Sequence, residues 1–197
     1  LKKRTVYQFD EYEMMTLRIL SSLMHSYDHL FSPDLYSFRR NKSVAAAVRR
    51  LFDTNNLCSM WGYKADVHDY FNSIDAKTLL TELKEDLNDE RLYALFEMIL
   101  SDSRAIYNGE VIKEQKGVMA GIPISAFLAN YYLSAVDHYF ETQDCIYMRY
   151  ADDILILSDS EDKIADFRLK LIDIIHARDL ELNPKKEKFF QPGEDFE

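Results

Sequence analysis

Two apolar runs at residues 146–150 (IYMRY) and 154–157 (ILIL) are joined only by Ala151-Asp152-Asp153. Both runs are rich in the β-branched and aromatic residues that favour strands, so the stretch predicts two strands with a tight acidic turn between them. Burying one ionised carboxylate without compensation is expensive, and two adjacent carboxylates repel each other. We therefore expect a cation to offset Asp152 and Asp153.

A third carboxylate ends another strand-like run. Residues 61–67 alternate and are rich in β-formers, which predicts a strand that ends near Asp66. A sheet that places this strand beside the acidic turn would gather Asp66, Asp152 and Asp153 at one edge. Such hard oxygen ligands suit Mg²⁺, and two bound ions can stabilise both oxygens of an in-line displacement. The alternative is plain turn chemistry, since Asp is favoured in tight turns, but the apolar flanks and Asp66 weaken it.

The order of the predicted elements indicates the fold class. From residue 61 onward the chain reads as strand, helices, strand-turn-strand and helix, which is close to a split βαβ sheet with helices on one face. The sequence thus predicts an α+β fold of the ferredoxin or RRM-like type, with an antiparallel sheet and packed helices. Helices are expected over about 10–27, capped by Asp10, and after the caps Ser43 and Asp75. Further helices are expected over about 89–100, 125–141 and 162–178, with a hairpin turn within 107–111 and a short strand pair within 180–190.

Charge is distributed unevenly along the chain. The 197 residues carry 24 Lys and Arg against 34 Asp and Glu, a net charge of −10, which argues against a polyanionic partner. Residues 1–60, however, hold nine basic and six acidic residues, whereas residues 61–197 hold 15 and 28. This asymmetry fits a protein that holds phosphates with one part and metal cations with another, although solvated helix faces explain most single charges.

Composition excludes several other classes. With 47% hydrophobic residues and few Gly and Pro, the chain predicts one continuous globular unit, and its first residue, Leu1, suggests a fragment. The two cysteines fit neither a disulfide framework nor a zinc site, so we expect a reducing, cytoplasmic location. The longest uncharged run, 118–136, contains Gly121, Pro123 and Asn130, which indicates a loop and a buried helix rather than a membrane span.

Residues 150–153, Tyr-Ala-Asp-Asp, resemble the YxDD box of reverse transcriptases, in the YADD form typical of bacterial enzymes of the group II intron and retron type. Three further stretches match palm motifs of that family in the right order: residues 66–75, 117–133 and 180–186. The resemblance covers nearly the whole chain. Four ordered motifs at compatible spacings make it specific.

The resemblance implies an organisation and an activity. Residues 1–60 would be a partial fingers subdomain and residues 61–197 the polymerase palm, together one continuous reverse transcriptase domain, with a thumb or further domains expected after Glu197. The implied activity is nucleotidyl transfer from dNTPs to the 3′-hydroxyl of a DNA or RNA primer on an RNA template. No membrane partner is expected.

The resemblance also assigns catalytic residues. Asp66, Asp152 and Asp153, with the backbone carbonyl of Val67, would hold two Mg²⁺ ions, with Mn²⁺ as an alternative. Lys186 would lie near the departing pyrophosphate and assist proton transfer to it. A solvated surface lysine is the structural alternative for Lys186, since Lys is seldom buried.

Five residues would contact the nucleotide. Lys3 and Arg4 would neutralise the triphosphate, and Arg39, in the next fingers segment, is a further candidate. Phe71 would act as the steric gate that excludes a 2′-hydroxyl, unless it is plain core. Gly121 would let the backbone approach the template–nucleotide pair.

One palm motif departs from the family pattern. Enzymes of the intron type usually carry Pro-Gln-Gly where this chain has Met119-Ala120-Gly121. The usual Gln side chain is therefore missing, and fidelity or template handling is expected to differ.

Three other functions remain open. A catalytically inert RNA-binding palm module would stack bases on Tyr70 and Phe71, but it would leave Asp152 and Asp153 unexplained. A nucleotide cyclase would show paired glycines where residues 149–151 stand. A template-independent or self-primed defence-type polymerase shares the palm motifs, which also do not separate the intron, retron, diversity-generating and defence lineages.

Overall fold

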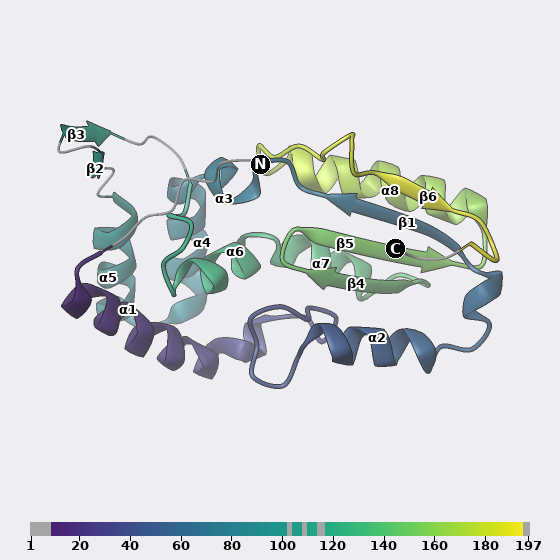
Figure 1. The fold of residues 1–197 in the computed structure, drawn as a ribbon, viewed down its shortest axis with the longest axis horizontal. Helices are drawn as coiled ribbons and strands as arrows, with labels where there is room; N and C mark the ends of the chain where they lie inside the picture. The colour runs from purple at the N-terminus through teal and green to yellow at the C-terminus, as the bar shows by residue number, and fades with distance from the viewer. Residues whose placement is uncertain (1–8, 102–103, 108–109, 114–116, 195–197) are drawn as a thin grey trace. The chain divides into compact units, whose positions relative to one another are not determined.

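The acidic hairpin lies in a four-stranded sheet. The computed structural model describes residues 9–101, 104–107, 110–113 and 117–194 (Figure 1). Every strand pairing in this sheet is antiparallel, which confirms the predicted α+β fold with an antiparallel sheet. The strands follow one another across the sheet in the order β4 (Ile146–Tyr150), β5 (Asp153–Ser158), β1 (Trp61–Asp66) and β6 (Lys188–Phe190).

Contacts divide the chain into two compact units. The helical unit consists of Leu1–Tyr27 and Asp69–Tyr132, and the sheet unit of Asp28–His68 and Leu133–Glu197. Each unit is thus built from two stretches that are distant in the sequence. The division into fingers (1–60) and palm (61–197) follows different boundaries and stays a prediction.

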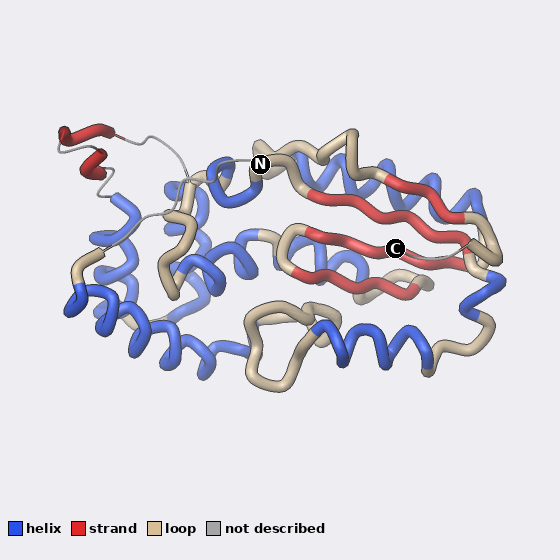
Figure 2. Tube along the Cα trace, in the orientation of Figure 1, coloured by secondary structure: helices blue, strands red, loops and turns tan. Residues whose placement is uncertain are grey.

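In the sheet unit, two helices cover one face of the sheet (Figure 2). Helix α8 (Glu161–His176) contacts β1 and β5, and α7 (Ser134–Phe140) contacts β4 and α8. The ring of Phe140 stacks on that of Tyr147 with centroids 4.9 Å apart, and each large side chain buried here stabilises the fold by roughly 1.5–3 kcal/mol. The buried residues of α8 follow helical spacing and are Ile164, Phe167, Leu171 and Ile175.

The sheet unit also contains α2 (Val44–Phe52) and the short 3₁₀ helix η2 (Leu57–Ser59). Ser43 caps α2 as predicted, because its hydroxyl accepts a hydrogen bond from the Ala46 amide. None of the residues of α2 is buried, so its apolar side chains face a partly open surface.

Helix α6 of the helical unit is buried along nearly its whole length. Leu79, Leu83 and Leu87 lie on one face of α4 and are buried, as the four-residue spacing requires. The predicted caps Asp10 and Asp75 both bind the first turn of the helix that follows them. The elements of this unit are α1 (Glu11–Leu23), α3 (Tyr70–Ser73), α4 (Ala76–Leu87), α5 (Glu90–Ser101), β2 (Arg104–Tyr107), β3 (Glu110–Lys113) and α6 (Ser125–Tyr132). The boundary with the sheet unit falls within the 3₁₀ helix η1 (Met24–Leu30).

Two sequence-based expectations were wrong in detail. The single helix expected over 125–141 is divided at Leu133 into α6 and α7, and neither Gly nor Pro marks the break in the sequence. The strand pair expected within 180–190 is a turn followed by β6, with an isolated bridge between Val67 and Leu182. The turn residues Asn108 and Gly109 lie outside the described residues, although β2 and β3 pair as predicted.

No helix in the described ranges combines the length and the apolar character that a bilayer crossing requires.

Candidate active site

Carboxylates from two strands meet at one end of the sheet. Asp66 is the last residue of β1 and pairs with Asp153, the first residue of β5, which confirms the predicted neighbourhood of the two strands. Because Tyr150 also pairs with Asp153, only Ala151 and Asp152 form the turn between β4 and β5. Paired residues share a face of a sheet and successive residues alternate, so Asp66 and Asp153 lie on the face opposite Tyr147, which packs against α7.

Asp66 is buried and held by two side chains. Its exposed fraction is 4%, and the ammonium Nζ of Lys186 lies 2.5 Å from its Oδ2. The side-chain amide of Asn183 donates to Oδ1 at 3.2 Å, and the backbone N–H of Asn183 donates to the Asp66 carbonyl at 2.7 Å. The structure therefore brings together the predicted residues Asp66 and Lys186.

Asn183 is a site residue that the sequence-based reasoning missed. Its backbone carbonyl accepts from the Lys186 amide at 2.9 Å, and its side-chain oxygen accepts from the Lys185 amide at 3.2 Å. This turn replaces the predicted strand and carries Lys186 to Asp66. An Asn-Pro pair is a turn signal, but it does not reveal a partner more than 100 residues away.

Asp152 completes the acidic edge from the turn. Its backbone carbonyl accepts a hydrogen bond from the Val67 amide at 3.3 Å, which ties the turn to the end of β1. Burial and the charges of Asp66 and Asp153 raise the pKa of the Asp152 carboxyl, and the Lys186 ammonium opposes that rise. The hydrogen bond to Asp66 in turn raises the pKa of Lys186. One ammonium thus compensates three neighbouring carboxylates only in part.

The chemistry of these ligands fits a divalent cation. Carboxylate oxygens are hard ligands, which Mg²⁺ and Mn²⁺ prefer. Across the described residues, no three His, Cys, Asp or Glu side chains are gathered closely enough to hold a metal ion as they stand. Asp66 binds the Lys186 ammonium instead, so the carboxylates would have to close around an incoming ion.

Comparison with known protein families decides what this acidic sheet edge belongs to. The sequence profile of the family described as "Reverse transcriptase (RNA-dependent DNA polymerase)" matches residues 2–196. The chain belongs to the reverse transcriptase family. The family is one of nucleotidyltransferases, in agreement with the four palm motifs. A search among curated proteins found no match.

Solved structures that resemble this reverse transcriptase domain include telomerases. Apo telomerase from Candida tropicalis aligns with a TM-score of 0.72 and 11% identity, over 90% of this chain and 36% of that one. Telomerase from Candida albicans, in complex with a TWJ fragment of telomeric RNA, aligns with a TM-score of 0.62 and 15% identity, over 90% of this chain and 35% of that one. The domain spans about a third of the length of these telomerases, and the likeness shows a shared fold.

Phe71, the predicted steric gate of the reverse transcriptase, lies in α3 of the helical unit. It is half-buried, and its ring meets that of Tyr70 edge-on with centroids 5.8 Å apart. The Val118 amide donates to the Phe71 carbonyl at 2.9 Å, and the Gly117 amide donates to the Ile74 carbonyl at 3.0 Å. The loop before α6 therefore holds the backbone of the Phe71 turn, and Phe71 as a gate stays a prediction.

Gly117 is a second residue that the sequence-based reasoning did not single out. Its φ is +97°, and a Cβ at this position would lie 2.5 Å from the Phe71 carbonyl oxygen and 2.8 Å from the Asn72 Cα. Only glycine fits such an approach. Gly121 also has a positive φ, +98°, and is exposed, which is compatible with its predicted place beside a bound nucleotide.

The predicted triphosphate ligands are Lys3, Arg4 and, as a further candidate, Arg39. Lys3 and Arg4 lie outside the described residues. Arg39 donates from Nη1 to the Ser32 carbonyl at 2.6 Å and from Nη2 to the Asp28 carbonyl at 3.1 Å. These contacts fold the segment around residues 28–39 onto the guanidinium, so Arg39 has a structural task here, and its role toward a nucleotide stays a prediction.

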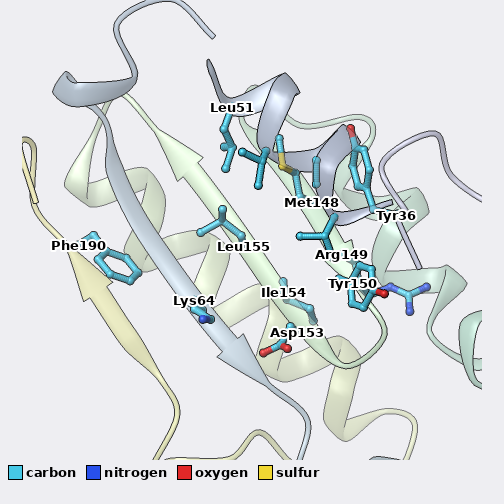
Figure 3. Close-up of a pocket in the computed structure, with 13 residues that line it drawn as sticks. Tyr36, Leu51, Lys64, Met148, Arg149, Tyr150, Asp153, Ile154, Leu155 and Phe190 are labelled. Carbon is cyan, nitrogen blue, oxygen red and sulfur yellow. The ribbon is translucent and has the colours of Figure 1, made fainter. Parts of the chain in front are cut away.

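A groove of about 320 Å³ runs along the sheet face that carries Asp153 (Figure 3). Its walls are apolar side chains of the sheet, such as Met148 and Leu155, and of α2, such as Leu51. Asp153 and Tyr150 lie at one end of it, and Phe190 lies on β6. The acidic edge of this reverse transcriptase domain thus opens onto an apolar surface rather than a second charged one.

Proposed function

We propose that the protein is an RNA-directed DNA polymerase that adds dNTPs to a primer 3′-hydroxyl on an RNA template. The observation that carries this proposal is the in-register pairing of Asp66 with Asp153 and the turn that sets Asp152 beside them. Membership of the reverse transcriptase family supports it, because the rest of the chain fits the same fold. The telomerase from Candida albicans binds RNA, which supports an RNA partner for this fold.

In this proposal, Asp66, Asp152 and Asp153, with the Val67 carbonyl, would hold two Mg²⁺ ions, or Mn²⁺ in their place. Such ions supply electrostatic stabilisation of the attacking and leaving oxygens when bound. The chain's own part is to bring the three carboxylates to one edge of the sheet, where Lys186 is their nearest counter-ion. Lys186 keeps its proton on Nζ because Asp66 stabilises the ammonium, so it can offer that proton near the leaving group.

The nucleotide-binding roles belong to the same proposal. Phe71 would discriminate dNTPs from rNTPs by shape, and Gly121 would allow close backbone approach. Lys3 and Arg4 would neutralise the triphosphate, with Arg39 as a further candidate. Ala120 in place of the usual Gln supports altered template handling.

Primer extension tests the proposal. The full-length protein is given a primed RNA template, dNTPs and Mg²⁺, beside the variants Asp152→Asn and Asp166→Asn. Asp166 is an exposed carboxylate on α8, so it controls for loss of one negative charge. Template-directed cDNA from the wild type and from Asp166→Asn, with none from Asp152→Asn, is the expected result.

The other outcomes separate the alternatives. Products made without a template would identify a template-independent or self-primed polymerase of the same fold. No product, together with metal-free RNA binding that ignores Asp152→Asn, would identify an inert RNA-binding palm.

We propose an intron-like or retron-like lineage because residues 150–153 resemble the YADD form typical of those enzymes, whereas the other palm motifs do not separate the lineages. Sequencing the RNA that co-purifies with the protein tests this lineage, and enrichment of no particular structured RNA would contradict it.

A further inference from the structure

Arg149 directly precedes the acidic motif and is buried against Asp137 of α7. Both side chains have an exposed fraction of 0%. The guanidinium donates from Nε to Asp137 Oδ1 at 2.7 Å and from Nη2 to Oδ2 at 2.5 Å. The hydroxyl of Tyr147 donates to the same Oδ1 at 2.7 Å. Such a bidentate pair fixes both partners in direction as well as in distance.

Stability alone does not explain this pair. Taking two charges out of water is costly, and apolar replacements of a buried pair are often as stable as the pair itself. A buried ion pair beside a functional turn therefore points to a geometric task. The contact made by the remaining guanidinium nitrogen, Nη1, shows what that task is.

The third guanidinium nitrogen of Arg149, Nη1, contacts the acidic turn. This nitrogen donates to the carbonyl of Ala151 at 2.9 Å. That carbonyl belongs to the peptide group that joins Ala151 to Asp152. Ala151 has a φ of +55°, a left-handed conformation that alanine rarely adopts, so the turn needs external support to persist.

A second support holds the other side of Ala151. The Ala151 amide donates to the hydroxyl of Ser37 at 2.8 Å. Ser37 is buried and follows a segment that runs along β4, where the Tyr36 amide donates to the Arg149 carbonyl at 2.9 Å and the Arg149 amide donates to the Asp34 carbonyl at 3.0 Å. The turn is thus held from α7 through Arg149 and from residues 34–37 through Ser37.

We infer that Arg149, held by Asp137, is a positioning residue that fixes the Ala151–Asp152 peptide and thereby the direction of the Asp152 carboxylate, with Ser37 as the second support. This inference rests on the proposed function, since it concerns how a metal-binding carboxylate is aimed. In this role Arg149 acts on the backbone of the turn, through the Ala151 carbonyl, and not on the substrate. Its effect passes through the turn.

The test replaces the pair without leaving a buried charge. The double variant Asp137→Leu/Arg149→Met keeps similar volumes, and Arg149→Lys keeps the positive charge but loses the forked geometry. Tyr147→Phe is the matched control, because it removes one hydrogen bond to Asp137 and none to the turn. All variants are first compared by thermal unfolding in the full-length protein.

Two readouts decide the matter in the folded variants. Amide hydrogen exchange of the peptide covering residues 149–155 is expected to be at least about 10-fold faster in the double variant and in Arg149→Lys, and unchanged in Tyr147→Phe. In primer extension, kcat is expected to fall about 10- to 100-fold with little change in the KM for dNTP, since the loss is one of alignment. Raising Mg²⁺ should recover part of the activity.

The outcomes distinguish this inference from the polymerase proposal. Unchanged exchange in the double variant overturns the positioning role whether or not the protein polymerises. Faster exchange with undiminished kcat also overturns it. A wild-type protein that makes no cDNA contradicts the polymerase function, while the exchange result still decides whether Arg149 fixes the turn.

Discussion

At the scale of single residues, the carboxylates of the acidic edge have unequal surroundings. Asp66 is neutralised by Lys186 and hydrogen-bonded by Asn183. Asp152 instead is half-buried and lies near two negative charges, those of Asp66 and Asp153, and both effects raise its pKa. In the absence of metal, Asp152 is therefore the carboxylate that costs the fold stability.

We predict that Asp152→Asn raises the melting temperature of the metal-free protein by about 2–4 °C, corresponding to about 1 kcal/mol for a chain of this size. The pKa of Asp152 is higher in the folded protein than in the unfolded one. Protonated Asp152 therefore stabilises the fold fully below the unfolded-state pKa, and this stabilisation is lost as pH rises through the folded-state pKa. The advantage of the variant should therefore vanish in acid and grow toward neutral pH.

The difference in melting temperature between Asp152→Asn and the wild type is measured by thermal unfolding from acid to neutral pH, once with chelator and once with Mg²⁺. Asp166→Asn is the control on an exposed site. An Asp152→Asn variant that is less stable than wild type in chelator would contradict the prediction, and Mg²⁺ should stabilise only proteins that keep Asp152.

Lys186 is the internal counter-ion of the site. Lys186→Met leaves the buried Asp66 carboxylate with Asn183 alone, so we expect a loss of about 1 kcal/mol of unfolding free energy in chelator, discounted because the Lys186 side chain is 55% exposed. The apparent affinity for Mg²⁺ should rise, since the ammonium no longer competes for Asp66, while primer extension should fall. Urea unfolding and calorimetric Mg²⁺ titration measure the two effects.

The neighbouring exposed lysine offers the matched control, Lys185→Met. If Lys185→Met and Lys186→Met change the unfolding free energy and the Mg²⁺ affinity equally, Lys186 is a solvated surface lysine.

Phe71 is testable by substrate choice. If its ring excludes a 2′-hydroxyl, Phe71→Ala should raise rNTP incorporation relative to dNTP incorporation by about 10-fold or more, because a steric exclusion disappears with the ring. Phe52→Ala, which removes an exposed ring on α2, should leave the ratio as it is. A ratio that stays constant in Phe71→Ala would assign Phe71 to the core.

At the scale of elements, the loop before α6 determines how α3 is held. Gly117 lies so close to the backbone of Phe71 and Asn72 that a methyl group has no room. The loop must therefore keep a glycine to pass α3, and the turn that carries Phe71 depends on a residue distant from it in sequence.

We predict that Gly117→Ala costs about 2 kcal/mol or more of unfolding free energy, from the strained φ together with the backbone clash. Gly193→Ala separates the two causes, because Gly193 also has a positive φ of +86° but open space around its missing Cβ. Urea unfolding of both variants is the measurement. Equal losses would mean that the clash is relieved by a movement of the loop.

The elements also show where sequence-based prediction ends. The caps Asp10, Ser43 and Asp75 were predicted correctly, because a capping side chain acts within three residues of itself. The break at Leu133 was not, since no local helix-breaking residue produces it. Local signals are readable in a single sequence, whereas a break imposed by packing is not.

At the scale of the whole molecule, most of the fold and part of the site could be predicted. Runs of β-forming residues predicted the strands next to Asp66 and Asp153, and the four motifs indicated the family. The partners Asn183 of Asp66 and Asp137 of Arg149 could not be predicted, because they depend on which elements pack together. The two compact units likewise join stretches that a linear division at residue 60 separates.

The two-residue turn between Tyr150 and Asp153 also limits how such a gene can vary. Because side chains alternate along a strand, inserting or deleting one residue in the turn would move Asp153 to the helix-packed face and Ile154 to the open one. Replacing Ala151 by another small residue would leave that alternation intact. Among natural variants that retain both sheet and site, length changes should therefore be absent from this turn while substitutions at position 151 are tolerated.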